Sequence, residues 1–249
     1  DPARAMEDAG AKAKIFVVQN RTASDIAKSV EDFSRLIGES QMIFLPGGFS
    51  AGDEPDGSGK FITAFFRGEA VKEAVKALLE ERDGPMARIC TGFQALIKLG
   101  LVPYGRITEP DEKAPTLTFN AIGRHQSRLV RTRIASNRSP WLSKTKVGEI
   151  YTVPISHGEG RFLASGEVVA ELAKNGQIAT QYVDLDGKPT YDIAFNPNNS
   201  VRAIEGITSP DGRVFGKMGH SERIGAGLYQ NVPGVFEMGM FRGAVEYFK

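Results

Sequence analysis

Short apolar runs alternate with amphipathic stretches in the N-terminal part of the chain. The runs at residues 15–18, 42–45 and 86–89 have the length of buried strands. Residues 22–38 and 91–100 place apolar side chains at helical spacing and end at glycines. This order of strands and helices predicts a parallel sheet flanked by helices.

The pattern changes after Pro103, where strand-like segments predominate. The strands predicted there are residues 116–120, 127–135, 150–156, 177–183, 201–208 and 213–218. Helices are predicted over residues 167–174 and 241–248. The Ser-Pro-Asp-Gly turn at residues 209–212 predicts that the last two strands form a hairpin. The sequence therefore predicts an α/β fold with antiparallel additions in its C-terminal half.

The first residues of the chain predict a helix rather than a strand. Pro2 suits the first helical position, and Gly10 suits a helix end. Doubly wound sheets usually open with a strand that becomes central. We therefore expect a first strand of the fold to lie upstream of residue 1.

Composition and charge exclude several classes of protein. The chain has 249 residues, 41% hydrophobic and 24% charged, which excludes a disordered or collagen-like polymer. Lys and Arg number 31 and Asp and Glu 30, so a net charge of +1 argues against nucleic acid as the partner. No apolar run approaches the ~18 residues of a membrane span, and no signal peptide is recognisable. With a single cysteine, these features predict a cytoplasmic protein without disulfides.

That cysteine, Cys90, stands where a predicted strand ends and a predicted helix begins. Such a turn can expose a nucleophile, and the positive end of the helix would lower the pKa of its thiol. Gly92 fits the nucleophile-elbow pattern, whereas Arg88 occupies a position where that pattern has glycine. The alternative is a small buried thiol that only fills the core.

A nucleophilic thiol needs a base, and the chain has three histidines. His125 lies in a basic strand without a nearby acid, whereas His157 and His220 are each followed two residues later by a glutamate. In extended backbone, residues two apart project to the same side, so Glu159 or Glu222 could orient its histidine. Spacing does not choose between the two pairs, and a locally bonded structural histidine remains the alternative for each. Nothing specific supports a metal site built from these side chains.

The glycine-rich segment 47–59 follows a predicted strand and could present backbone N–H groups to an oxyanion. It lacks the order of glycine, lysine and serine or threonine found in a phosphate-binding P-loop. An ordinary loop is the alternative. The arginines at 124–138 predict a solvated strand face or, less commonly, a docking surface.

Three motifs in order carry a resemblance to a known family. They are Leu-Pro-Gly-Gly-Phe-Ser at 45–50, Ile-Cys-Thr-Gly-Phe-Gln at 89–94 and Gly-His-Ser-Glu-Arg at 219–223. The chain resembles the class I glutamine amidotransferases, most closely the glutaminase domain of phosphoribosylformylglycinamidine synthase. The resemblance implies a flavodoxin-like, mostly parallel sheet flanked by helices. It implies one domain over 1–249 that lacks its first strand and forms the C-terminal part of a large single-chain synthase.

The resemblance also implies roles for individual residues. Cys90 would attack the carboxamide of glutamine and form a thioester, releasing ammonia. His220 would act as the general base and acid, oriented by Glu222, and Gln94 would contact the substrate. The backbone N–H groups implied to hold the oxyanion are those of Gly48, Phe49 and Thr91. Arg88 and Thr91 depart from the family pattern, which has Gly and Asn there.

The implied partners are glutamine and a synthase that makes formylglycinamidine ribonucleotide in purine biosynthesis. No cofactor and no metal are implied in this domain, and ATP and magnesium are expected on the synthase. Two other functions stay open. The elbow cysteine suits a DJ-1/PfpI-like stress or redox protein, whereas Arg88 and the arginine-rich strand suit a catalytically silent docking module.

Overall fold

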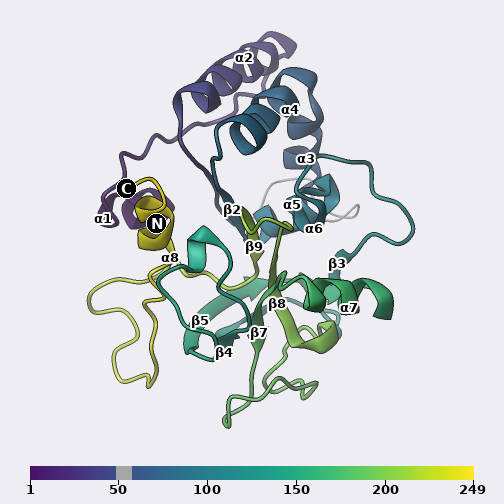
Figure 1. The fold of residues 1–249 in the computed structure, drawn as a ribbon, viewed down its shortest axis with the longest axis vertical. Coiled ribbons are helices and arrows are strands. Elements are labelled where there is room, and N and C mark those ends of the chain that lie inside the picture. The colour runs from purple at the N-terminus through teal and green to yellow at the C-terminus, as the bar shows by residue number, and fades with distance from the viewer. Residues whose placement is uncertain (49–57) are drawn as a thin grey trace.

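The computed structural model describes residues 1–48 and 58–249 (Figure 1). The helices are α1 (Pro2–Asp8), α2 (Ala23–Glu39), α3 (Lys60–Arg67), α4 (Glu69–Lys76), α5 (Thr91–Leu99), α6 (Leu101–Tyr104), α7 (Gly166–Lys174) and α8 (Met240–Glu246). The strands are β1 (Ile43–Leu45), β2 (Met86–Ile89), β3 (Thr116–Phe119), β4 (Gln126–Ile134), β5 (Ile150–His157), β6 (Glu159–Leu163), β7 (Ile178–Tyr182), β8 (Ile204–Thr208) and β9 (Val214–Lys217). Apart from the strand predicted at 15–18, the predicted alternation of helices and strands in the N-terminal part is confirmed.

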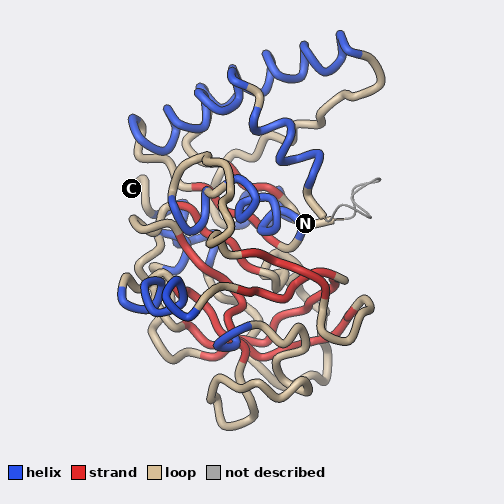
Figure 2. The backbone as a smooth tube through the Cα atoms, turned by 90° about the vertical axis from the view of Figure 1, so that its right-hand side faces the viewer, coloured by secondary structure: helices blue, strands red, loops and turns tan. Residues whose placement is uncertain are grey.

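A seven-stranded mixed sheet runs in the order β1-β2-β9-β8-β7-β4-β5, and β3 and β6 form a separate antiparallel pair. In Figure 2 the strands run together through the lower half, with the longer helices above them. β1 with β2 and β2 with β9 are parallel, and the other neighbours in this sheet are antiparallel. The α/β fold with an antiparallel C-terminal half is confirmed. The sheet is mixed rather than mostly parallel as the resemblance implied, because the strands of the C-terminal half join it antiparallel.

Two hydrophobic clusters pack on opposite sides of the sheet. Val214 and Phe215 are neighbours on β9 and belong to different clusters, because successive side chains of a strand point to opposite faces. The first cluster includes buried residues of α2, α4 and α5, and the second those of α1 and α8. In Figure 1, α1 and α8 lie side by side with both termini, away from α2, α3 and α4.

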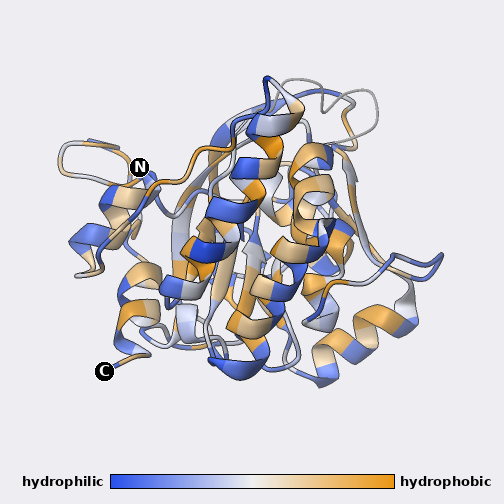
Figure 3. Cartoon of the chain, turned by 90° about the horizontal axis from the view of Figure 1, so that it is seen from above, coloured by the Kyte–Doolittle hydropathy of each residue, from blue (hydrophilic) through white to orange (hydrophobic). Residues whose placement is uncertain are grey.

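Helix α2 forms where the sequence predicts a cap and an apolar face. The Thr22 Oγ1 accepts a hydrogen bond from the Asp25 N–H at 3.1 Å, which satisfies one of the free donors of the first turn. Phe33 and Ile37 are buried on the inner face, and the Phe33 ring meets Phe66 of α3 with centroids 5.7 Å apart. Figure 3 shows the resulting alternation of hydrophilic and hydrophobic bands along the surface helices.

Residues 15–18 are the clear exception to the predicted elements. They form no strand; Ile15 is 79% exposed and Val17 65% exposed. Phe16 alone of this run packs against the first hydrophobic cluster. A strand is stable only with a hydrogen-bonded neighbour, and no described strand pairs with this segment. The prediction of a strand at 15–18 is therefore wrong for the described structure.

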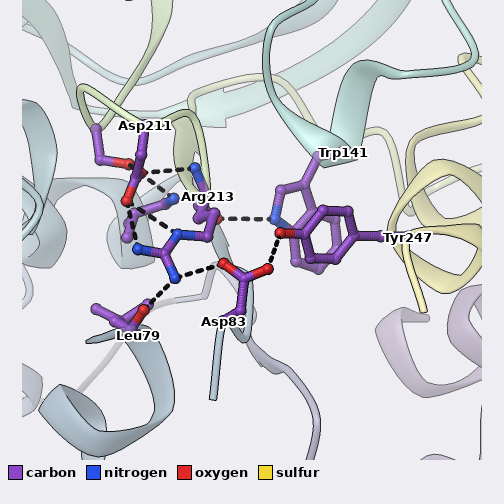
Figure 4. A network of polar contacts seen from close by, with 8 residues as sticks. Leu79, Asp83, Trp141, Asp211, Arg213 and Tyr247 are labelled. Carbon is purple, nitrogen blue, oxygen red and sulfur yellow. Dashed lines mark hydrogen bonds and ion pairs between the residues drawn. The ribbon is translucent and has the colours of Figure 1, made fainter. Parts of the chain in front are cut away.

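The predicted hairpin of β8 and β9 is confirmed, and polar contacts fix its turn (Figure 4). The Arg213 guanidinium donates to Asp211 Oδ2 at 2.7 Å and to Asp83 Oδ1 at 2.8 Å. Asp83 also accepts from the Tyr247 hydroxyl at 2.5 Å, and the Trp141 indole donates to the Arg213 carbonyl at 3.3 Å. The start of β9 is thereby tied to the segment after α4 and to α8. No helix within the described ranges is long and apolar enough to cross a membrane.

Candidate active site

Cys90 lies at a strained turn between β2 and α5. Its backbone angles are φ 55° and ψ −117°, a conformation that a residue with a side chain rarely adopts and that often marks an active site. The Cys90 N–H donates to the Lys217 carbonyl of β9 at 2.9 Å, and the Cys90 carbonyl accepts from the Gln94 N–H at 3.1 Å. A Cβ on Gly92 would lie 3.0 Å from the Leu45 carbonyl oxygen, so the turn leaves little room for a side chain there. This is the geometry that the elbow pattern predicted.

Arg88 finds room beneath this turn by lying against an aromatic ring. Its side chain is fully buried, with the guanidinium carbon 4.3 Å from the centroid of the Phe66 ring. None of its three guanidinium nitrogens has a hydrogen-bond partner within residues 1–48 and 58–249. Burial without a counter-charge places the pKa of Arg88 well below the usual arginine value. The elbow accommodates the large residue by burying its guanidinium against the Phe66 ring.

His220 lies just beyond the end of β9, opposite the elbow. Its Nδ1 is 2.6 Å from Glu222 Oε1, and both side chains are buried. A Cβ on Gly47 would lie 2.7 Å from the Cys90 Cβ and 2.9 Å from the His220 Cε1, so both side chains border Gly47. The His220 Nε2 has no hydrogen-bond partner among the described residues. The structure thus brings together Cys90, His220 and Glu222, the three residues that the resemblance implies.

The thiol is kept protonated by its surroundings. Burial raises the pKa of the Cys90 thiol to about 11, outweighing the hydrogen bonds from Thr91 and the charge of Arg223 that lower it. The prediction that the helix terminus makes this thiol acidic is therefore wrong. The Sγ–H donates to the Ser156 carbonyl at 3.5 Å. Nucleophilic attack from this site requires a base that removes the proton.

Donors for an oxyanion lie partly within the described structure. The Thr91 backbone hydrogen bond to the thiol places that N–H beside the nucleophile. The Thr91 Oγ1 donates to the Gly48 carbonyl at 2.5 Å, which links the elbow to the glycine-rich segment. Gly48 has φ 153°, in the region that favours glycine. Phe49 lies outside the described residues.

Gln94 faces the start of β6 from the first turn of α5. Its Nε2 donates to the Glu159 carbonyl at 2.5 Å, while its buried Oε1 has no partner in the described part of the chain. The Glu159 Oε2 accepts from the Ser58 N–H at 3.0 Å, and its Oε1 is likewise without a partner among the residues that the structure describes. Buried polar atoms are normally satisfied. Each of these oxygens can therefore accept a hydrogen bond from a polar ligand.

The other two histidines have different environments. His157 is buried, its Nδ1 lies 3.2 Å from Asn120 Oδ1, and burial together with the nearby His220 lowers its pKa to about 3. His125 is exposed, and its Nε2 lies 3.1 Å from Ser156 Oγ. No three His, Cys, Asp or Glu side chains gather as metal ligands in the described parts of the chain.

Sequence reasoning missed a buried ion pair beside the site. Lys217 on β9 and Glu205 on β8 are both fully buried, with Nζ and Oε1 3.3 Å apart. The sequence did contain a signal for this pair. Each of the two apolar strands β8 and β9, which form the predicted hairpin, carries one charged residue. The pair lies next to the segment that carries His220.

Comparison with known proteins agrees with this geometry. Residues 1–248 match the family model described as the CobB/CobQ-like glutamine amidotransferase domain. Phosphoribosylformylglycinamidine synthase subunit PurQ of Methanococcus maripaludis is 31% identical over 100% of this chain and 92% of its own length. The Treponema denticola subunit PurQ is 34% identical over 89% and 82%, and that of Thermomicrobium roseum 38% identical over 73% and 69%.

Solved structures share the fold. The structure of PurLQS from Thermotoga maritima has a TM-score of 0.68 and 24% identity, covering 100% of this chain and 92% of that chain. The glutaminase domain of Trypanosoma brucei CTPS with bound acivicin has a TM-score of 0.54 and 15% identity, covering 98% and 87%.

The curated relatives are named as subunits, which gives no support to the expected single-chain synthase. The family match over residues 1–248 and the full-length relative fix the assignment. The chain belongs to the CobB/CobQ-like glutamine amidotransferases and, among them, to the family of PurQ subunits, the glutaminase component of phosphoribosylformylglycinamidine synthase.

Proposed function

We propose that this chain hydrolyses glutamine through a Cys90 thioester and supplies the ammonia to a synthase partner that makes formylglycinamidine ribonucleotide. The observation that carries the proposal is that the Cys90 and His220 side chains both border Gly47, with Glu222 Oε1 2.6 Å from His220 Nδ1. A nucleophile, a base and an orienting carboxylate in this order are the parts needed for acyl transfer from an amide.

The first half-reaction forms the thioester. The Cys90 thiol gives its proton to the free Nε2 of His220 as Sγ bonds to the carboxamide carbon of glutamine. The negative charge on the carboxamide oxygen is held by backbone donors, of which the Thr91 N–H lies beside the thiol. The C–N bond then breaks, and the imidazolium returns the proton to the departing nitrogen, which leaves as ammonia.

The second half-reaction restores the enzyme. His220 removes a proton from water, the resulting hydroxide bonds to the thioester carbon, and the C–S bond breaks to release glutamate. The proton on His220 returns to the sulfur. A pKa of about 11 for Cys90 means that proton transfer accompanies the attack, because the resting group at neutral pH is the thiol.

Glu222 fixes the tautomer of His220. Its carboxylate accepts from the Nδ1–H, which leaves Nε2 free to take a proton from Cys90. The contact also stabilises the imidazolium that forms during the reaction. Two free oxygens, Gln94 Oε1 and Glu159 Oε1, suit the ammonium group of the substrate amino acid.

The partner is a synthase in a separate chain. The relatives are named as synthase subunits, which favours this arrangement over the single-chain one. ATP and magnesium belong to that partner. A redox-sensing function is disfavoured, because sensor thiols are exposed and acidic, whereas Cys90 is buried with a raised pKa.

The test is glutamine hydrolysis by the chain in complex with a synthase subunit. Wild type should release ammonia and yield a γ-glutamyl hydroxamate when hydroxylamine traps the thioester, while Cys90→Ala should do neither. The same assay compares His220→Gln, which removes the proposed base, with His125→Gln as the control. His125 is exposed and has no part in the proposed mechanism. Full activity of Cys90→Ala would remove the basis of the proposal.

A further inference from the structure

Lys217 and Glu205 form an ion pair that is sealed from solvent. Their side chains are 0% exposed, and Nζ lies 3.3 Å from Oε1. The second carboxylate oxygen accepts a hydrogen bond from the Thr180 hydroxyl of β7. Both charges are therefore compensated inside the sheet.

The remaining contacts of this pair are made with the segment that carries the catalytic base. Lys217 Nζ donates to the Gly219 carbonyl and to Ser221 Oγ, each at 3.0 Å. The Glu205 Oε1 accepts from the Gly219 N–H at 2.6 Å. The residues on both sides of His220 are thus held by one buried cation and one buried anion.

The same lysine also holds the nucleophile. Lys217 pairs with Ile89 in the parallel register of β9 and β2, and its carbonyl accepts from the Cys90 N–H at 2.9 Å. The backbone of Lys217 therefore holds the Cys90 turn, while its side chain holds Gly219 and Ser221 on either side of His220. One residue connects the two halves of the reacting pair.

Close packing at Gly219 shows how tightly this segment is held. A Cβ there would lie 2.6 Å from Val153 Cγ2, 2.9 Å from Glu205 Oε1 and 3.2 Å from Lys217 Nζ. The backbone at this position is enclosed by the ion pair on one side and by β5 on the other. Movement of either charged group would change where His220 lies.

The fold does not by itself require a buried ion pair at these two positions. Two charges removed from water are commonly no more stabilising than an apolar pair of similar volume. Neighbouring buried positions of both strands, such as Ile207 and Val214, are apolar. The pair therefore needs a reason other than packing.

We infer that Lys217 and Glu205 are positioning residues that set the placement of the His220 imidazole against Cys90. This rests on the proposed glutaminase function, because it concerns the geometry of that site. Neither residue touches the reacting atoms. Misplacement of a catalytic group by about 1 Å can lower a rate about a hundredfold, so such a clamp has a measurable effect.

The test compares Lys217→Met, Glu205→Gln and the double variant, each in complex with the synthase. A single substitution leaves one buried charge without its partner and should lower Tm. The double variant has no unpaired charge, so its Tm should return to within about 4 °C of wild type. Val214→Ala is the matched control, because it weakens β9 at a core position away from His220.

The expected result separates stability from catalysis. The double variant should keep a kcat at least about tenfold below wild type with KM for glutamine within about twofold, because Met and Gln cannot hold Gly219 and Ser221 as Lys217 does. Val214→Ala should lose Tm without this fall in kcat. If kcat recovers together with Tm in the double variant, the inference about Lys217 and Glu205 is wrong, whereas the proposed glutaminase function is unaffected. An inactive wild-type complex would overturn the proposed function as well.

Discussion

Gly47 lies directly against Cys90: a Cβ added to the glycine would be 2.7 Å from the Cβ of the cysteine. The same Cβ would be 2.9 Å from Cε1 of the His220 ring, so it would crowd both the nucleophile and the base. Real Cβ atoms do not approach other atoms this closely, so something in the site must shift. The absence of a side chain at this position leaves room for both groups.

Gly47→Ala should therefore remove glutaminase activity while leaving the fold intact. We expect kcat of the complex with the synthase to fall about a hundredfold or more, because proton transfer needs hydrogen-bond reach. Ammonia release measures this, and circular dichroism checks the fold. Gly158→Ala is the control, since a Cβ there meets nothing within 4 Å. Equal activity of the two variants would contradict the geometry.

Glu222→Gln should lower kcat by about a hundredfold or more, because the amide no longer stabilises the imidazolium and can favour the wrong tautomer. The affinity for glutamine should change little, as Glu222 contacts His220 rather than the substrate site. Steady-state kinetics of the complex separate kcat from KM. Glu73→Gln, an exposed substitution on α4 with the same change of charge, is the control.

Alkylation of Cys90 should be slow at neutral pH and should accelerate steadily towards pH 11. With a pKa raised to about 11 by burial, roughly one thiol in a thousand is ionised at pH 8. Because Cys90 is the single cysteine, incorporation of iodoacetamide measured by mass spectrometry reports this group alone. A rate that reaches its plateau near pH 7 would contradict the protonated resting thiol.

His157 should make the chain less stable in mild acid. Its pKa is lowered to about 3 in the folded state against 6.5 in the unfolded chain, so its contribution is complete above pH 6.5 and declines as the pH falls towards 3. Between pH 7 and pH 5 this costs about 2 kcal/mol in the free energy of unfolding. Urea titrations at both pH values measure it. His157→Asn can retain the contact to Asn120 and should lose this part of the pH dependence; an unchanged slope would refute the assignment.

Arg88→Met should raise the free energy of unfolding by about 1–3 kcal/mol, because a buried guanidinium without hydrogen bonds to the described residues is replaced by an apolar chain of similar length. The contact with Phe66 would be retained as an apolar one. Urea unfolding at pH 7 measures the change. The control Arg106→Met, at an exposed position, should change the free energy of unfolding little. Destabilisation by Arg88→Met would instead show that the charge of Arg88 is compensated in the folded chain.

Much of the fold could be predicted because it depends on local signals. The Thr22 cap, the apolar face of α2 and the turn at 209–212 act over a few residues, and each formed as predicted. The segment at 15–18 has the same apolar character as a strand, but strand formation depends on a neighbour elsewhere in the chain. Its local pattern was not sufficient.

The site required information that spacing does not contain. His157 and His220 have the same relation to a glutamate in the sequence, and the parallel pairing of β2 with β9 brings His220 to Gly47. The thiol pKa was mispredicted because the helix terminus was visible in the sequence, whereas the burial of Cys90 was not. The pair of Lys217 and Glu205 depends on the same distant pairing.

The parallel pairing of β2 with β9 links the refolding of this protein to its activity. β2 and β9 come from distant parts of the sequence, so their alignment is among the slower events of folding. A slip of one residue would turn Lys217 to the opposite face and withdraw its carbonyl from Cys90. Such a misaligned molecule would keep its helices and most of its circular dichroism signal but could not turn over glutamine. Recovered turnover, rather than recovered secondary structure, is therefore the measure of a correctly aligned sheet in this protein.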